Sequence, residues 1–169
     1  MGQLKITQPV LMQSFADKFN LPEGSAPATP AEPRSVLMKA RDDEAVDGTE
    51  QLTYRFGVGK LIHLMKWSRP DVLNAVRDLT RHMSKATLCH IKAMKRVMRY
   101  ITATGDFGLT LKPNEKWDGS KEFEFKVAGY SDSDFEKDPA THKSLSGAAV
   151  FLNGALISMR SKMQDCTTL

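Results

Sequence analysis

The sequence predicts an α+β chain, with a helical region first and an antiparallel sheet after it. Two observations support this fold class. From about Tyr54 to Gly105 apolar residues recur at every third or fourth position, which is the spacing of amphipathic helices. After Gly105 short runs of branched and aromatic residues are typical of strands. We expect four segments: 1–21, 22–53, 54–105 and 106–169.

The first two segments differ in composition. A short amphipathic helix is predicted from about Pro9 to Asn20, because its apolar residues repeat at helical spacing. Residues 22–53 contain four closely spaced prolines and then a charged stretch with few large apolar side chains. Such a composition favours a flexible linker, and we assign it no regular structure.

Three helices are predicted in segment 54–105. The first starts near Tyr54, and the second starts at Pro70, where Ser68 and Asp71 have the spacing of a capping box. The third runs from about 87 to 104 and stops at Gly105, because glycine commonly terminates helices.

The last segment, 106–169, has strand signals. The runs GLTL and FEFKVAGY suit strands, and AAVFLNGALISM contains two apolar runs joined by Asn153-Gly154. Both residues of that dipeptide tolerate positive φ, so the pattern predicts a two-residue type I′ hairpin.

Composition excludes several classes of protein. Two distant cysteines, Cys89 and Cys166, argue against a disulfide scaffold or a zinc site. No stretch is long and apolar enough to span a bilayer. The net charge of +4 in 169 residues is mildly basic, so the distribution of charge matters more than its sum. We expect a soluble, intracellular protein without membrane contact.

The third predicted helix has one basic side. When successive residues are placed 100° apart, a set of cations falls within roughly 100° of arc, and the apolar residues fall opposite. No acidic residue occurs between Lys85 and Gly105. One interpretation is a solvated surface; the other is a nucleic-acid interface in which each cation contacts a phosphate. The candidate binding residues are Lys92, Lys95, Arg96 and Arg99.

A run of carboxylates follows the predicted strand that ends in GYSDSD. Alternate residues of an extended chain point the same way, so Asp132 and Asp134 are expected on one face. Carboxylates at a strand end are potential Mg²⁺ ligands, whereas a solvated acidic turn is the simpler alternative.

The ordered sequence blocks resemble copia-type (Ty1/copia) retrotransposon Pol polyproteins. YRFGVGKLIHL followed by SRPDVLNAV is similar to the family's Y-R-x-x-V-G-x-L-x-Y-L and T-R-P-D-I-x-x-A-V. HIKAMKRVMRYITATGDFGL is similar to H-x-x-A-x-K-R-V-L-R-Y-L-x-G-T-x-x-x-G-L. GYSDSDFEKD followed by KSLSG and ISMRSKMQ is similar to G-Y-S-D-A-D-W-A-G-D, K-S-T-S-G and I-S-W-x-S-K-K-Q.

This resemblance implies the thumb and connection of a reverse transcriptase, followed by the first three strands of a ribonuclease H-like fold. Asp132 matches the first catalytic aspartate of that nuclease, a Mg²⁺ ligand, and Asp134 matches a second family aspartate. The family activities are RNA-directed DNA synthesis and hydrolysis of RNA in RNA–DNA hybrids, and the family acts in the cytoplasm or in virus-like particles.

The chain departs from the family pattern in its catalytic groups. The paired aspartates of the polymerase and most carboxylates of the nuclease have no counterpart here. We therefore expect a transposon-derived fragment that catalyses neither reaction and does not hold Mg²⁺ tightly. The alternatives are a non-catalytic module that binds hybrid or duplex nucleic acid weakly, and a subunit completed by the rest of the polyprotein or by another chain.

Overall fold

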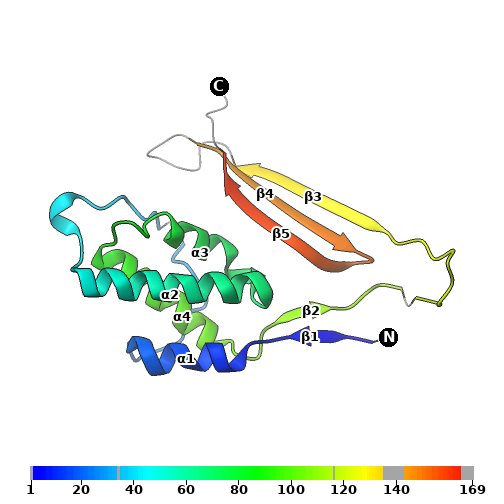
Figure 1. Ribbon diagram of the computed structural model, residues 1–169, viewed down its shortest axis with the longest axis horizontal. Helices are drawn as coiled ribbons and strands as arrows, with labels where there is room; N and C mark the ends of the chain where they lie inside the picture. Colours follow the sequence, from blue (N-terminus) through cyan, green and yellow to red (C-terminus); the bar gives the residue numbers. More distant parts are fainter. Residues whose placement is uncertain (1, 34, 116, 135–142, 165–169) are drawn as a thin grey trace. The chain divides into compact units, whose positions relative to one another are not determined.

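The computed structural model describes residues 2–33, 35–115, 117–134 and 143–164, and it is a mixed α and β structure as predicted (Figure 1). The chain divides into two compact units. One is helical and comprises Ile6–Leu109. The other comprises Met1–Lys5 and Thr110–Leu169 and contains the sheet of β3, β4 and β5.

The helical unit begins with α1 (Pro9–Phe19), close to the predicted range. The next long helix, α2 (Gly48–Trp67), starts well before Tyr54, so the predicted start was wrong. The reason is local: the Asp47 side chain accepts a hydrogen bond of 2.7 Å from the Glu50 N–H and caps the helix. A short 3₁₀ helix, η1 (Asp42–Glu44), also lies in the stretch that was assigned no regular structure.

After α2 the chain makes a 3₁₀ turn, η2 (Pro70–Val72), which leads into α3 (Leu73–Thr80). The helical turn does start at Pro70, but the predicted capping box does not form. Ser68 instead closes α2, because both its N–H and its hydroxyl bond to the Leu64 carbonyl, at 3.0 and 3.4 Å. Ser68 is therefore a helix end, not a helix start.

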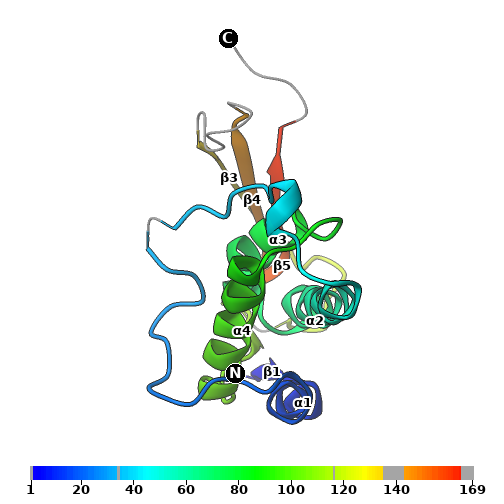
Figure 2. The ribbon, with the colours of Figure 1, turned by 90° about the vertical axis from the view of Figure 1, so that its left-hand side faces the viewer.

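The last helix, α4 (Leu88–Ala103), agrees with its predicted range. Figure 2 views α1 and α2 nearly end-on, and α4 runs across them. Gly57 of α2 lets these helices approach closely: a Cβ there would lie 2.5 Å from Met94 Sδ of α4. The core of the unit joins all four helices and includes Met12, Phe15, Phe19, Tyr54, Val58, Leu61, Leu64, Val76, Leu79, Met94, Val97, Met98 and Ile101.

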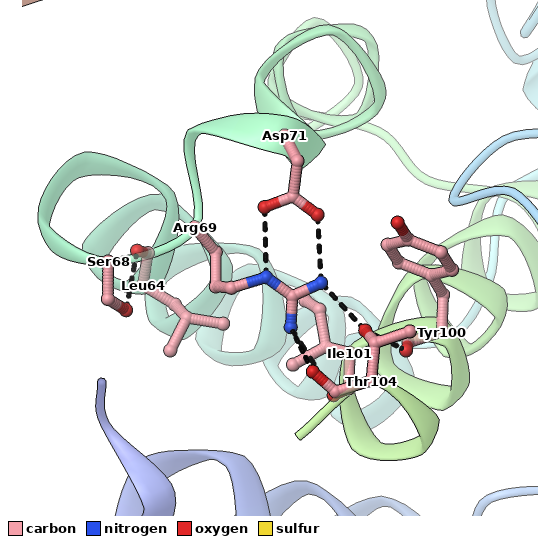
Figure 3. Close-up of polar contacts among 7 residues, drawn as sticks. All are labelled: Leu64, Ser68, Arg69, Asp71, Tyr100, Ile101 and Thr104. Atoms are coloured by element: carbon pink, nitrogen blue, oxygen red, sulfur yellow. Dashed lines mark hydrogen bonds and ion pairs between the residues drawn. The ribbon is translucent and has the colours of Figure 1, made fainter. Parts of the chain in front are cut away.

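Arg69 fastens the carboxyl end of α4 to the turn after α2 (Figure 3). Its side chain is fully buried, and its guanidinium makes a bidentate pair with Asp71 at 2.9 and 2.8 Å. The same group donates to the carbonyls of Ile101 at 3.5 Å and Thr104 at 3.1 Å, which lie at the end of α4. These bonds satisfy carbonyls that have no partner within the helix.

Two short strands, β1 (Leu4–Ile6) and β2 (Leu109–Leu111), form a separate two-stranded sheet. The GLTL run is thus a strand, but its partner comes from the start of the chain, which no sequence signal indicated. Gly108 permits a close approach just before β2, since a Cβ there would lie 2.5 Å from the Ile6 carbonyl oxygen.

The main sheet is antiparallel, in the order β3 (Val127–Asp134), β4 (Leu145–Leu152) and β5 (Ala155–Met163). Its hairpin is the one predicted: Asn153 and Gly154 both have positive φ, 47° and 82°. The strand predicted in FEFKVAGY starts only at Val127. No helix in the described residues is long and apolar enough to cross a membrane.

Candidate nucleic-acid interface

The two sides of α4 separate as predicted. Met94, Val97, Met98 and Ile101 are buried in the helical core. Opposite them is the basic face, which we define as Lys92, Lys95, Arg96 and Arg99. Leu88, the one apolar residue on that side, is exposed. The helix therefore presents four cations and no acid on one side.

The structure adds a feature that the sequence did not reveal: the connecting segment, whose described residues are 20–33 and 35–46, lies along α4 (Figure 2). Lys95 donates a hydrogen bond of 3.2 Å to the Asn20 carbonyl, and Arg99 donates one of 2.5 Å to the Ser25 carbonyl. The predicted linker thus contacts the predicted interface. The sequence could not predict these contacts, because the acceptors are backbone carbonyls, which every residue has.

The other two cations of the basic face, Arg96 and Lys92, make few contacts with the described residues. Arg96 contacts Glu32 at 3.4 Å, and the Glu32 side chain is 66% exposed, so this pair is weak. The Nε of Arg96 is buried and has no hydrogen-bond partner among the described residues. Lys92 is exposed and makes no hydrogen bond or ion pair within the described residues. An open groove of about 1270 Å³ runs between the connecting segment and α4, and Lys92, Lys95 and Arg96 line it.

The outer side of α2 is a second basic surface that sequence reasoning missed. Phe56 and Trp67 are more than half exposed there, and Lys60 and Lys66 lie 5.0 and 5.4 Å from the centres of these two rings. The sequence contains the signal, because the seventeen positions from Gln51 to Trp67 include no acidic residue. Cations interleaved with exposed aromatic rings are typical of surfaces that bind single-stranded nucleic acid.

The predicted nuclease aspartate, Asp132, lies near the end of β3, opposite Gly147 of β4, and is exposed. Because β4 and β5 form the Asn153-Gly154 hairpin, Asp132 lies in a strand paired with that hairpin, as predicted. Asp134 is the last residue of β3, opposite Leu145, and its side chain lies outside the described part of the structure. The remaining carboxylates of the run, at 136 and 138, also lie outside it.

The described side chains do not fit a two-metal site around Asp132. Within residues 2–134 and 143–164, apart from the few positions not described, no three His, Cys, Asp or Glu side chains are grouped closely enough to hold a metal ion. A two-metal site needs several converging carboxylates.

Comparison with known proteins shows which proteins the chain is similar to. No protein-family model matches it, and no solved structure matches it. It is 30% identical over 161 residues to the Retrovirus-related Pol polyprotein from transposon RE1 of Arabidopsis thaliana, which covers 95% of this chain. It is 34% identical over 137 residues to the corresponding polyprotein from transposon RE2 of the same plant, which covers 81% of this chain.

The chain belongs to the copia-type retrotransposon Pol family. It spans only 10% of the length of the RE1 polyprotein and 9% of that of RE2. It is also 34% identical over 120 residues to the Secreted RxLR effector protein 161 of Plasmopara viticola, a match that covers 71% of this chain and 79% of that protein. The chain is therefore similar both to long Pol polyproteins and to this much shorter protein.

Proposed function

We propose that this copia-type Pol fragment derives from the junction of reverse transcriptase and ribonuclease H, that it catalyses neither reaction, and that it binds nucleic acid through the basic face of α4. The geometry of that face is the main support for nucleic-acid binding. Its four cations share one side of a helix that has no acid, and two of them contact only neutral carbonyls in the described structure. A phosphate is a stronger acceptor for Lys95 and Arg99 than a carbonyl.

The ribonuclease H-like part of the proposal is supported by strand order and by Asp132. The sheet has three antiparallel strands in sequential order, which the family resemblance implies for the start of that fold. The position of Asp132 near the end of the first strand supports its match to the family's nuclease aspartate. The proposed lack of catalysis rests on the sequence, in which most carboxylates of the family's nuclease have no counterpart.

The binding proposal predicts weak, sequence-independent affinity for duplex or hybrid nucleic acid. If the four cations contact phosphates, log affinity falls with log salt by about 0.9 for each contact. Fluorescence anisotropy of a labelled RNA–DNA hybrid over a salt series measures both quantities. We expect reversal of the four charges to glutamate to abolish binding.

A matched variant controls for net charge. It reverses four exposed lysines elsewhere, namely Lys5, Lys18, Lys112 and Lys121. We expect this variant to weaken binding slightly, because it alters only the general field. Equal losses in both variants would show that the basic face is an ordinary solvated surface.

The catalytic proposal is tested with the same hybrid, labelled in the RNA strand, with Mg²⁺ or Mn²⁺. We expect no cleavage by the protein and none by an Asp132→Asn variant. Metal-dependent cleavage by the parent that the variant lacks would refute the proposal. It would indicate that another chain completes the carboxylate site.

A second candidate function, assembly with the rest of the polyprotein or with another chain, rests on the outer strands of the sheet. In the described residues β3 and β5 each pair on one side only, with β4. Unpaired strand edges are templates for a further strand. Sedimentation of the purified chain over a concentration series tests this: a persistent monomer at high concentration refutes assembly of the chain with itself.

A further inference from the structure

Two histidines stack inside the helical unit. The rings of His82, in the turn after α3, and His90, in the first turns of α4, have centroids 3.9 Å apart and planes inclined by only 14°. Both side chains are buried, with 6% and 1% of their residue surfaces exposed. The sequence supports packing roles for them but does not indicate that they meet.

The hydrogen bonds of His90 determine its tautomer. The Thr87 N–H donates to Nδ1 at 2.9 Å, so Nδ1 carries a lone pair. The proton of the neutral ring is then on Nε2, which donates to the Met38 carbonyl at 2.9 Å. Protonation of Nδ1 would place an N–H group against the Thr87 N–H. The hydrogen bond that caps α4 would then be lost. His90 therefore caps α4 only while it is neutral, whereas its Nε2–H can donate to the Met38 carbonyl in either protonation state.

His82 holds the adjacent residue of the same segment, since it hydrogen-bonds to the backbone of Leu37. Its Nε2 is buried and has no partner among the described residues. The two histidines thus form hydrogen bonds with the backbone of two consecutive residues, Leu37 and Met38. Farther along, the connecting segment is held by a hydrogen bond of 3.1 Å from the Val46 N–H to the Ala86 carbonyl.

Burial, and for His82 also neighbouring positive charge, opposes protonation of the pair. Burial lowers the pKa of His82 to about 4, with further lowering by His90 and Arg81 and partial opposition from Leu37 and Asp78. Burial also lowers the pKa of His90, opposed by its bond to Met38. From α2 the facing titratable group is the Tyr54 ring, 6.3 Å from His90, whose own pKa is raised by burial. Tyr54 is therefore neutral throughout the relevant range.

We propose that the stacked pair of His82 and His90 is an acid-sensitive latch that holds the connecting segment against α4 when neutral and releases it when protonated. Two cations at stacking distance in a buried site repel each other, and only release of the segment lets water reach them. The folded-state pKa values lie below the ordinary value of about 6.5. The latch is therefore fully closed above about pH 6.5 and is lost progressively as pH falls toward about 4.

Hydrogen exchange measured by mass spectrometry at pH 7.5 and pH 5.0 tests this latch. Exchange rates are corrected for the intrinsic pH dependence of amide exchange. We expect the protection of peptides that cover residues 36–47 to fall by roughly thirtyfold at the lower pH, as a His82 pKa lowered from about 6.5 to about 4 implies. Peptides from the middle of α2 should keep their protection. Unchanged protection of residues 36–47, or an equal loss in α2, would overturn the proposal.

The decisive variant is His82→Phe, which keeps an aromatic ring over His90 but removes the titrating group. We expect it to lose most of the pH effect, whereas His63→Phe, at an exposed histidine of α2, should respond like the parent. A wild-type response in His82→Phe would overturn the latch. If that variant does not fold, NMR titration of the parent decides: His82 must titrate well below the ordinary histidine value of about 6.5, and a midpoint at that value refutes the proposal.

Discussion

Arg69 binds Thr104 twice, across a separation of 35 residues. Its Nη1 donates to the Thr104 carbonyl at 3.1 Å, and its Nη2 donates to the Thr104 hydroxyl at 2.7 Å. The guanidinium carbon also lies 5.5 Å from the ring centres of Tyr100 and Phe107. The end of α4, and with it the orientation of the basic face, therefore depends on one buried cation.

Replacing that cation should destabilise the protein strongly. We expect Arg69→Gln to lower the free energy of unfolding by about 3 kcal/mol, because the buried guanidinium and its bonds to Asp71, Ile101 and Thr104 are lost. Urea denaturation measures the change. Arg55→Gln, at an exposed position of α2, is the control and should cost less than about 0.5 kcal/mol. Similar values for the two variants would contradict the role of Arg69.

Two glycines of α2 should respond in opposite directions to alanine. At Gly57 a Cβ would lie 2.5 Å from Met94 Sδ and 2.9 Å from a ring carbon of Phe19, so we expect a loss of about 1–3 kcal/mol. At Gly59 a Cβ meets nothing within 4 Å, so we expect a gain of about 0.5–1 kcal/mol from higher helix propensity. Thermal unfolding of the two single variants is the measurement. A stabilising Gly57→Ala would show that the helices do not approach closely there.

The hairpin turn should be sensitive at Gly154. Its φ of 82° is strained for alanine, and a Cβ would also collide with the Asn114 side chain. We expect Gly154→Ala to weaken hydrogen-exchange protection of β4 and β5, corresponding to about 1–2 kcal/mol. Gly147→Ala, where the nearest neighbour would be 3.8 Å away, is the matched control and should leave that protection intact. Equal effects would contradict the assigned turn.

Two residues of the basic face should separate binding from stability. We expect Lys92→Ala to reduce the salt slope of nucleic-acid binding by about 0.9 while leaving unfolding unchanged, since this side chain is exposed. Arg99→Ala should reduce the slope similarly but also cost about 1 kcal/mol, because the Ser25 carbonyl loses its donor. Salt titrations and urea denaturation on the same samples measure both. If neither slope changes, these cations do not contact phosphates.

Local patterns predicted most of the regular structure. The apolar spacing placed α1 and α4 within a residue or two of their observed ends, and Asn153-Gly154 adopted the turn that its φ preferences require. The errors arose where one side chain decided the outcome. Asp47 extended α2 into the predicted linker, and Ser68 bonded backward to Leu64 and not forward as a cap. Such choices depend on which partner is reached first, which periodicity does not encode.

The sequence by itself determined the family, the fold class, the two-sided character of α4 and the place of Asp132 near a strand end. Each of these follows from neighbours along the chain, where helix and strand periods act directly. Only the tertiary structure decided that the connecting segment contacts Lys95 and Arg99 of the basic face, that Arg69 is buried, and that His82 and His90 stack. Those contacts join residues distant in sequence, and many of their acceptors are backbone carbonyls. Every residue has such a carbonyl, so residue identity carries no signal for them.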